Sequence, residues 1–588
     1  MFSILPLCQN PPNARPTADL RNPYAELFGA SLGVEPGTPV LPVSDSPSAD
    51  ARMAGSGPSP NSSERHRSVL TSWFLAALPI LLLVVLILGF GWSAARAGPA
   101  GWLAAAAIAW IAFGAGSEVL AVAQAKAFFL AVDVLLIVWG AYLLYRVVDE
   151  AGGVTTLAAA LPRLTPDRGW QALLIAWAFA SFLQGVGGFG VPVVVTAPIL
   201  LGLGFDPVTA VVAPSLGHAW SVTFGSLGSS FQALIVASGV PGSVMAAESA
   251  ALLGAACLAC GALVLRAVGG RTRLLVPVLV IGLTMATTQA ALAVAGLWHI
   301  AGLGGGLAGL AVGFVWARVS PRPSQPGSPR TPTRQVVLAL VGYGLLVLIT
   351  LSVQFVGPLR DLLGAVIIQA QFPSVTTARG LVTPAEPGKS LVLLRHAGAI
   401  LVYAAALTYF LLRRAGTMPP RSAGRIAVDT ARGVLGSSVA IVSMTAMVTI
   451  MAHAGMTDVL ARGLSQVAGG AFPLVSPWIG ALGAFVSGSN TSSNLLFGML
   501  QRRTAEYLGL TVAWILAAQT AGGAVGSVLS PTKVSVGATS ARGARSREGQ
   551  PPPPDTEARI LRAVVGSAAP LLLGLGVLTV VALLVGRS

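Results

Sequence analysis

Long apolar stretches alternate with short polar ones through most of the chain. The first, residues 69–90, exceeds the roughly 20 residues that a helix needs to cross a bilayer. Further apolar stretches lie at 99–114, 119–145, 170–183, 190–204, 208–239, 246–265, 274–296, 299–317, 335–357, 397–412, 433–453, 466–486, 508–528 and 563–586. Some are too short to cross alone and are typical of re-entrant hairpins. The pattern predicts an all-α polytopic membrane protein with about twelve transmembrane helices and two re-entrant hairpins.

Polar segments at the ends and in the middle of the chain set the expected domain boundaries. Residues 1–68 are rich in Pro, Ser, Ala and Gly and lack periodicity, which predicts a disordered N-terminal extension before a membrane domain over 69–588. Met53 is an alternative translation start within that extension. The polar segment 359–394 predicts an extramembrane loop, and residues 541–558, which include four consecutive prolines, predict a flexible linker.

Two glycine-rich polar segments interrupt the apolar pattern. They read FLQGVGGFGVP (182–192) and FVSGSNTSSNLLFG (485–498), and further polar stretches follow at 217–230 and 519–533. Phe182 and Gly185 match Phe485 and Gly488 at one offset of 303 residues. The agreement in order and spacing predicts an internal repeat, with motifs in 182–232 and 485–540. Such repeats often have inverted topology and bind the transported molecule at their interface. The alternative is that Gly/Ser helix-packing motifs recur by chance.

Composition supports the membrane interpretation. Only 10% of the residues are charged and 54% are hydrophobic, whereas a soluble domain carries about 25% charged residues. The net charge of +15 comes mostly from arginines between the apolar stretches, where they indicate topology. No aromatic residues interleave with them, so nucleic-acid binding is disfavoured. Cys257 and Cys260 form a CxxC inside an apolar helix, where two small core residues are the favoured interpretation over redox or metal chemistry.

The polar breaks supply candidate binding groups. An unsatisfied polar group costs several kcal/mol in lipid, so the hydroxyls and amides of 487–494 fit a hairpin tip better than a lipid-facing helix. Helix N-termini at such a tip present N–H groups to an anion, and glycines allow a ligand to approach the backbone. The candidate substrate-binding residues are Gly185, Gly187, Gly188, His218, Ser221, Ser226, Ser489, Asn490, Thr491, Ser492, Asn494, Ser530 and Lys533.

Ionisable residues inside apolar segments are candidates for function. Lys533 directly follows Ser-Pro-Thr in the second repeat, where an ammonium would suit a substrate carboxylate or replace a bound cation. The alternative is an interfacial lysine whose head reaches water. His218, in the first repeat, is a candidate to donate to a carboxylate or to relay a proton. A hydrogen-bonded packing histidine is the alternative.

Other ionisable residues fit structural roles better. Lys126 and Asp133 are seven residues apart, hence on one helical face, and are expected to pair with each other or to face a scaffold interface. His299, His396 and His453 lie near the ends of predicted spans, where a structural role is expected.

At these motifs the chain resembles the lactate permease family. The resemblance runs through 164–207, 217–228, 488–501 and 519–537, and the hydrophobic frame of 69–588 agrees with it. It implies a permease domain over 69–588 and secondary symport of small monocarboxylates, such as L-lactate or glycolate, across the plasma (inner) membrane, usually with protons. More distantly, Ser489-Asn490-Thr491 is similar to a signature of the ion-transporter superfamily, which implies a scaffold and a mobile, elevator-like transport domain.

The chain departs from this family where a coupling ion would bind. Lactate permeases often have Glu at the position of Gln184, Asp at that of Asn490 and Lys at that of Ser527. An amide cannot take up a proton near neutral pH. The candidate coupling-ion residues are then Gln184, Asn490, Thr491 and His218, with the ion a proton or sodium. The remaining options are that the substrate acid itself brings the proton or that coupling has been lost.

We therefore expect a transporter rather than an enzyme, with no cofactor and no metal. Its expected partners are a small organic anion, a proton or sodium, and the lipid bilayer, with no nucleic acid; homo-oligomerisation is left open. A sodium-coupled or uncoupled carrier of another small organic or inorganic anion is the main alternative. An intramembrane enzyme that uses His218 and His453 is disfavoured because no HExxH motif is present. A membrane sensor or scaffold that acts through the polar N-terminus is the third option.

Overall fold

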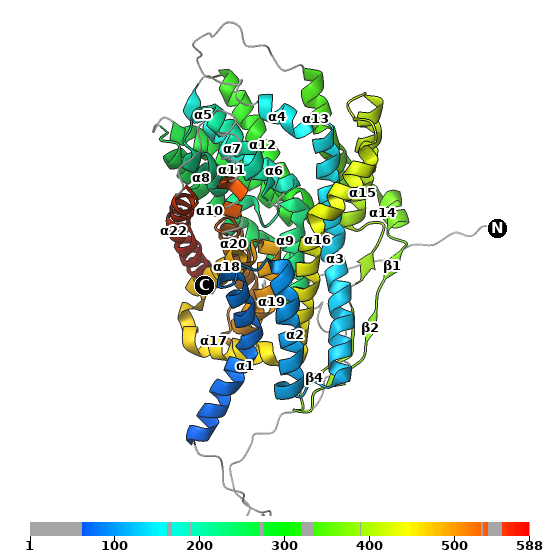
Figure 1. Cartoon of the computed structure of the whole chain (residues 1–588), viewed down its shortest axis with the longest axis vertical. Coiled ribbons are helices and arrows are strands. Elements are labelled where there is room, and N and C mark those ends of the chain that lie inside the picture. The colour runs from blue at the N-terminus through cyan, green and yellow to red at the C-terminus, as the bar shows by residue number, and fades with distance from the viewer. Residues whose placement is uncertain are drawn as a thin grey trace, which may run out of the picture. The chain divides into compact units, whose positions relative to one another are not determined.

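The computed structural model describes residues 62–160, 167–187, 190–270, 274–319, 333–388, 390–530, 533–534, 536–538 and 556–586. Within these ranges, 11 helices are long and apolar enough to cross a membrane (Figure 1). The predicted all-α polytopic fold is confirmed. Two apolar helices, Val191–Gly202 and Val512–Val528, are shorter than a span, and they replace the stretches predicted at 190–204 and 508–528. Re-entry of helix pairs into the bilayer stays a prediction.

Long helices without a break form one part of the bundle. They are α1 (Ser62–Leu88), α2 (Ala94–Phe113), α3 (Ser117–Glu150), α13 (Thr333–Phe355), α15 (Ala397–Arg414) and α16 (Ser422–His453). Helix α3 packs along α15 and α16. At one end of α3, Arg146 donates to Asp149 and to Asp429 of α16, both at 2.6 Å. These ion pairs fix the register between the two longest helices.

The repeat motifs lie in shorter helices that precede a long helix in each half. The first half has α5 (Arg168–Leu173), the π-helical η2 (Leu174–Phe179), α6 (Ala180–Val186), α7 (Val191–Gly202), α8 (Pro207–His218), α9 (Ser229–Ser238) and α10 (Gly242–Ala267). The second half has α18 (Phe472–Ser487), α19 (Asn490–Tyr507), α20 (Val512–Val528) and α22 (Thr556–Val585). Each half runs from a helix pair through a polar break to a long helix.

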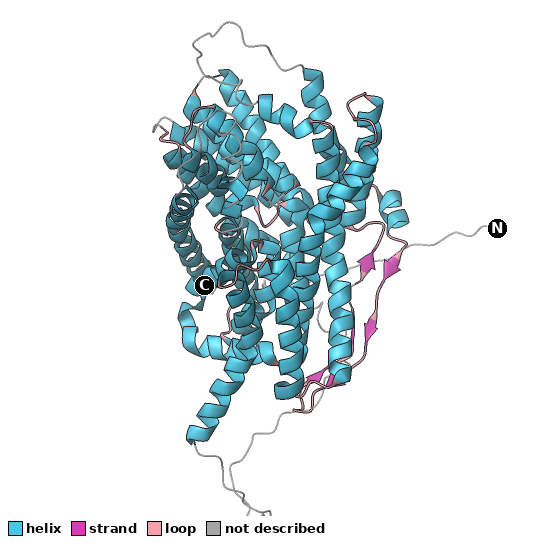
Figure 2. Ribbon diagram, in the orientation of Figure 1, coloured by secondary structure: helices cyan, strands magenta, loops and turns pink. Residues whose placement is uncertain are grey.

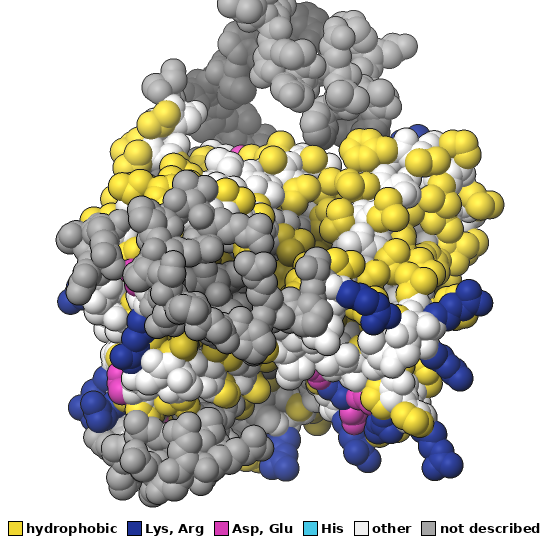
Figure 3. Space-filling view, turned by 90° about the horizontal axis from the view of Figure 1, so that it is seen from above, with side chains coloured by type: hydrophobic (Ala, Val, Ile, Leu, Met, Phe, Trp, Pro, Cys, Tyr) yellow, Lys and Arg dark blue, Asp and Glu magenta, His cyan; other side chains and the backbone are white. Residues whose placement is uncertain are grey.

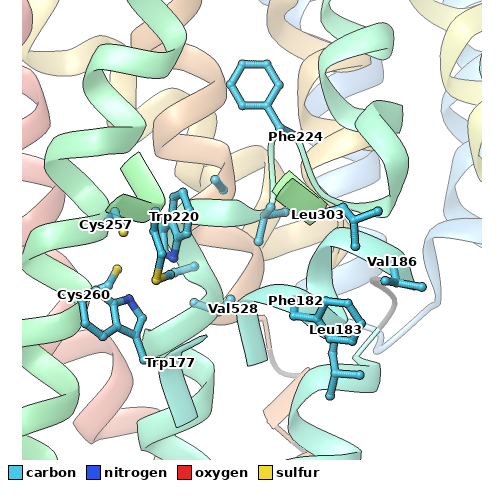
Figure 4. Close-up of a cluster of buried hydrophobic side chains, with 14 of the residues drawn as sticks. Trp177, Phe182, Leu183, Val186, Trp220, Phe224, Cys257, Cys260, Leu303 and Val528 are labelled. Atoms are coloured by element: carbon cyan, nitrogen blue, oxygen red, sulfur yellow. The ribbon is translucent and has the colours of Figure 1, made fainter. Parts of the chain in front are cut away.

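The remaining helices surround these two halves. They are α4 (Gly153–Ala160), α11 (Leu275–Val294), α12 (Trp298–Val319), α14 (Gly357–Leu363) and α17 (Met456–Ala468). Large side chains of the first half pack between α10 and α12, and Cys257 and Cys260 lie beside Trp177 and Trp220 in this core (Figure 4). Both thiols are free and fully buried. Their surroundings agree with the interpretation of this CxxC as two small core residues.

The polar segment before α15 has strand structure. Three antiparallel pairs of two-residue strands form a ribbon: β1 (Ile367–Ile368) with β6 (Leu391–Val392), β2 (Gln371–Phe372) with β5 (Glu386–Pro387), and β3 (Val375–Thr376) with β4 (Val382–Thr383) (Figure 2). The ribbon lies along α3, since Lys126 forms an ion pair with Glu386 and the N–H of Ala378 donates to Gly114 O at 2.8 Å. Whether it lies outside the membrane, as expected for 359–394, is untested.

The termini and the surface bear on the remaining expectations. Helix α1 begins at Ser62, seven residues before the predicted first span, whereas residues 1–61 and 539–555, which hold most of the predicted extension and linker, lie outside the described residues. Figure 3 shows broad areas of apolar side chain on the molecule's surface, with Lys and Arg side chains projecting from another part of the same face. Exposed apolar side chains such as Ile111 and Leu103 fit contact with lipid.

Candidate functional site

The second polar segment forms the tip of a helix pair. Helix α18 ends at Ser487, Gly488 adopts a left-handed conformation (φ 74°), and α19 begins at Asn490. Ser489 caps α19 by accepting the N–H of Ser492. The two helices fold back on each other, because the hydroxyl of Ser493 donates to Gly480 O at 2.7 Å. The window 487–494 thus contains the end of α18, the residues between the helices and the first turn of α19, where N–H groups have no intrahelical partner.

The polar stretch 217–230 of the first repeat interrupts a helix. The single span predicted over 208–239 is instead α8 and α9, separated by two 3₁₀ turns at Ala219–Ser221 and Ser226–Gly228. Ser226 and Leu227 have left-handed backbones, with φ of 46° and 54°. Such strain persists only where surrounding contacts enforce it, and it clusters at functional sites. We refer to residues 219–228 as break 1.

Break 1 and the start of α9 meet the tip of the second helix pair. The side-chain amide of Asn490 donates to Thr223 Oγ1 and to Thr520 O, both at 3.2 Å. That of Asn494 donates to Ser230 O at 2.9 Å and to Thr520 Oγ1 at 2.8 Å. We call these five residues and Thr491 the polar junction; in it, the hydroxyls of Ser230 and Thr491 share a hydrogen bond of 3.0 Å. Figure 1 shows α9, α19 and α20 together in the interior of the bundle.

The polar junction has acceptors that the protein itself leaves unused. Asn490 Oδ1 and Asn494 Oδ1 are buried and receive no hydrogen bond from the part of the chain that the structure describes. Each amide oxygen can accept a donor or coordinate a cation. A buried acceptor without a donor costs about 1–3 kcal/mol. These oxygens are therefore suited to a substrate hydroxyl or a cation, but not to a carboxylate.

Lys533 brings a cationic group to the end of α20. Its Nζ donates to Ser527 Oγ at 3.3 Å, and its backbone N–H donates to Ser530 Oγ at 3.3 Å. The charge of Lys533 also lies within electrostatic range of His218. This grouping joins the end of α8 to the second polar stretch. The ammonium thus lies on buried protein groups rather than on an exposed surface.

His218 has one ring nitrogen committed to the backbone. Its Nδ1 lies 2.5 Å from Pro214 O, so Nδ1 carries the proton and donates. Nε2 of the neutral ring is then an acceptor, and it is buried with no partner among the described residues. Neutral His218 can accept from a hydroxyl, and it can donate to a carboxylate, as expected from the sequence, only after it takes up a proton.

Gln184 lies against break 1. A Cβ atom on Gly225 would stand 2.9 Å from Gln184 Nε2, so α6 packs closely on break 1. Gln184 Oε1 is buried and has no partner in the described ranges. Gly185 has a packing role, since a Cβ there would lie 2.7 Å from the backbone of Leu303 on α12. Gly187 ends α6 beside Tyr145.

The other predicted residues lie at the breaks, but several bind their own backbone. Ser221 lies in break 1 and donates to His218 O at 2.9 Å, whereas Ser226 holds a strained backbone there. Ser492 forms part of the α19 cap. Gly188 lies outside the described residues. Thr223, Ser230 and Thr520 were not singled out from the sequence, although all three belong to the polar stretches that signalled the site.

Lys126 and Asp133 do not pair with each other. Lys126 forms an ion pair with Glu386 of the ribbon. Asp133 accepts from Gln232 Nε2 at 2.6 Å and from His396 Nε2 at 3.1 Å. Because the two residues are two helical turns apart, each finds a nearer partner on a neighbouring element.

Most of the chain matches one known protein family. The sequence profile described as L-lactate permease matches residues 72–551. The L-lactate permease of Bacillus subtilis is 26% identical over 435 residues, which cover 67% of this chain and 76% of that protein. The glycolate permease GlcA of Escherichia coli is 26% identical over 471 residues, covering 70% and 80%. The YdaH transporter of Alcanivorax borkumensis, a solved structure, aligns with a TM-score of 0.40 at 14% identity and covers 76% of this chain and 84% of its own.

Proposed function

The chain belongs to the L-lactate permease family, and from that premise we propose that it carries a small monocarboxylate, such as L-lactate or glycolate, in symport with a cation. It is a multi-pass protein of the plasma (inner) membrane and a transporter rather than an enzyme. The observation that carries the proposal is the polar junction, where Asn490 and Asn494 of one repeat meet Thr223 and Ser230 of the other.

The groups around the polar junction match the parts of a 2-hydroxy acid. Its carboxylate would bind near the first turn of α19, where N–H groups and the helix dipole favour an anion, with Lys533 as the counter-charge. Its hydroxyl would donate to a free amide oxygen of Asn490 or Asn494, or to His218 Nε2. A substrate without the hydroxyl would leave that acceptor buried and unpaired.

Alternating access would follow from movement of the repeat helices against the long helices α3, α15 and α16. The polar junction joins α9 to α19 and α20, so these helices would move as one body. The strained backbone of break 1 would keep its N–H and C=O groups directed at the ligand rather than into a helix. In this scheme the inverted repeat supplies the two sides from which the site opens.

Counterflow in vesicles tests the proposal. Vesicles that contain the purified full chain are loaded with unlabelled L-lactate and diluted into labelled L-lactate, with no ion gradient. We expect transient, saturable accumulation of label that glycolate competes away and propionate, which lacks the hydroxyl, competes away poorly. Absence of saturable counterflow with either hydroxy acid would overturn the proposed function.

The first candidate is a proton-coupled carrier, and a sodium-coupled carrier is the second, which one observation favours. The unused amide oxygens Asn490 Oδ1 and Asn494 Oδ1 are hard oxygen ligands of the kind that alkali cations bind. Uptake measured with a sodium gradient and no pH gradient separates the two candidates. Accumulation driven by sodium alone would select this one.

A further inference from the structure

Asp133 is the buried carboxylate of the long helix α3. It is 3% exposed, in a helix apolar enough to cross the membrane. An ionisable residue at such depth is expensive to keep and is expected to serve function. The site described above does not use it. Gln232 and His396, which lie 99 and 263 positions away in the chain, both donate hydrogen bonds to this carboxylate.

The hydrogen-bond pattern fixes the protonation of His396. The N–H of Gly398 donates to His396 Nδ1 at 3.1 Å, which makes His396 the N-cap of α15. Since Nδ1 accepts, the proton of the neutral ring lies on Nε2, and Nε2 donates to Asp133 Oδ1 at 3.1 Å. A second proton on this ring would remove the cap. His396 is therefore held as a donor to Asp133, and the Asp133 carboxylate is the acceptor of the pair.

Gln232 links this carboxylate to the polar junction. Its amide donates to Asp133 Oδ2 at 2.6 Å, the short distance of a charge-assisted bond. Gln232 lies on the ten-residue helix α9, two residues after Ser230, which binds Thr491 and Asn494. Ionised Asp133 thus holds α9 against α3. A neutral carboxylic acid is a weaker acceptor, so a proton on Asp133 loosens that attachment.

We propose that Asp133 is the proton-binding residue that couples transport, with His396 and Gln232 as its positioning residues. The proposal rests on the symport function proposed above and names its coupling site. One proton adds to a carboxylate oxygen, and the charge of the Asp133 side chain changes from −1 to 0. Transport of this proton together with one monocarboxylate anion moves no net charge. This group supplies the acid that Gln184 and Asn490 cannot.

The chemistry of the site favours a proton over sodium. The hydrogen bonds of 2.6 and 3.1 Å to the Asp133 carboxylate come from N–H groups, which are not ligands for sodium. The titratable groups on the elements packed against Asp133 include His396 at the start of α15 and Lys126, which lies two turns along α3 and pairs with Glu386 of the ribbon. They also include Tyr403 on α15, Arg425 and Arg432 on α16, and His453 on α16, which lies within electrostatic range of the Lys126–Glu386 pair. The Arg146 cluster, with Asp149, Glu150 and Asp429, lies further along α3.

The test compares Asp133→Asn with wild type in proteoliposomes containing the full chain. Labelled L-lactate is followed in counterflow without a gradient and in net uptake under an inward proton gradient. We expect Asp133→Asn to retain counterflow to within about twofold, whereas its accumulation ratio under the proton gradient falls to about one, the value for an uncoupled carrier. Glu118→Gln, which neutralises an exposed carboxylate of the same helix, should match wild type in both assays.

The outcomes separate the two proposals. Wild-type vesicles without hydroxy-acid counterflow would overturn the transport function itself. If counterflow is normal and Asp133→Asn accumulates L-lactate under a proton gradient as well as wild type does, the coupling site alone is overturned. The same follows if a sodium gradient drives accumulation equally in wild type and in Asp133→Asn. If Asp133→Asn fails to insert into the membrane, Gln232→Leu tests the coupling site instead. Loss of its hydrogen bond makes the ionised carboxylate less favourable, so the pH of half-maximal uptake should move upward by about one unit. An unchanged pH profile would overturn the proposal.

Discussion

Asn490 donates a hydrogen bond of 3.2 Å to the hydroxyl of Thr223, which lies 267 residues earlier in the chain. One residue starts α19, and the other lies in break 1. This contact joins the tip of the second helix pair to break 1 of the first repeat. The side-chain amide oxygen of Asn490 faces Gly523 on α20. The first prediction tests that junction.

Asn494→Leu should reduce L-lactate counterflow by at least about tenfold, because it removes the two buried hydrogen bonds that Asn494 donates to Ser230 O and Thr520 Oγ1. Asn494→Asp keeps the shape but replaces the donor with an acceptor, so it should be equally impaired. Gln501→Leu, which alters a buried amide of the same helix away from the junction, is the matched control. Wild-type counterflow in Asn494→Leu would remove the junction from the site.

Lys533→Ala should lower uptake by at least about tenfold while the protein still inserts normally, because the substrate carboxylate loses its counter-charge. Lys533→Arg keeps the charge and should retain part of the activity. Lys126→Ala removes a lysine that pairs with Glu386 and is the control for loss of charge alone. The assignment is wrong if the apparent affinity for L-lactate is the same in Lys533→Ala and wild type.

Gln184→Glu introduces a carboxylate beside Gly225 of break 1. We expect uptake by this variant to gain a second pH-dependent step, because a buried carboxylate there can take up a proton and the amide cannot. The informative measurement is Gln184→Glu combined with Asp133→Asn. Recovery of proton-driven accumulation in the double variant would show that either position can hold the coupling proton, and continued uncoupling would restrict that role to α3.

Gly522→Ala should destabilise the protein by about 1–3 kcal/mol, because the added Cβ would lie 1.9 Å from Pro477 O, where α18 crosses α20. Thermal unfolding in detergent measures this as a lower Tm. Gly566→Ala is the matched control: it lies in α22 with open space around its Cβ position, and it should stabilise the helix by up to about 1 kcal/mol. A Tm for Gly522→Ala at or above that of wild type would contradict the packing.

Asp206 caps α8 from the loop after α7 by accepting the N–H groups of Val208 and Thr209. Burial alone would raise the pKa of Asp206, but the hydrogen bonds from Thr209 and Val208 outweigh it and lower the pKa. A lowered pKa stabilises the fold above the unfolded value of about 3.9, and this contribution is lost as the pH falls through the folded value.

Asp206→Ala should accordingly cost about 1 kcal/mol at pH 7. Its Tm should begin to approach that of wild type as the pH falls below about 4, and the two should converge below the lowered folded pKa, where the wild-type carboxylate is protonated. Asp361→Ala, at an exposed ion pair, should show no such convergence. A Tm difference for Asp206→Ala that is constant with pH would refute the cap as the cause.

Much of the site was predictable because its polar residues stand out against apolar sequence. Asn490, Thr491 and Asn494 were named for that reason, and all three belong to the polar junction. Lys533 was named for the same reason, and it contacts Ser527 and Ser530 at the end of α20. The structure differs from the prediction where the same local sequence pattern is compatible with more than one fold. The stretch 208–239 is apolar enough for one span, but it is two helices, because strained turns at Ser226 and Leu227 interrupt it.

The partners of Asp133 show where sequence reasoning stops. Spacing on one helix suggested Lys126, whereas the structure supplies Gln232 and His396 from other elements. Helical periodicity states which residues share a face, but it contains no information on which distant segment covers that face.

The sequence by itself determined that this is a polytopic helical membrane protein with two polar breaks, because apolar length and unsatisfied polar groups have large, local energetic consequences in lipid. Only the tertiary structure decided that Asn490 contacts Thr223, that His218 Nδ1 donates to Pro214 O of its own helix, and that His396 donates to Asp133. These contacts depend on distances between segments far apart in the chain, and such distances are set by the packing of the whole bundle.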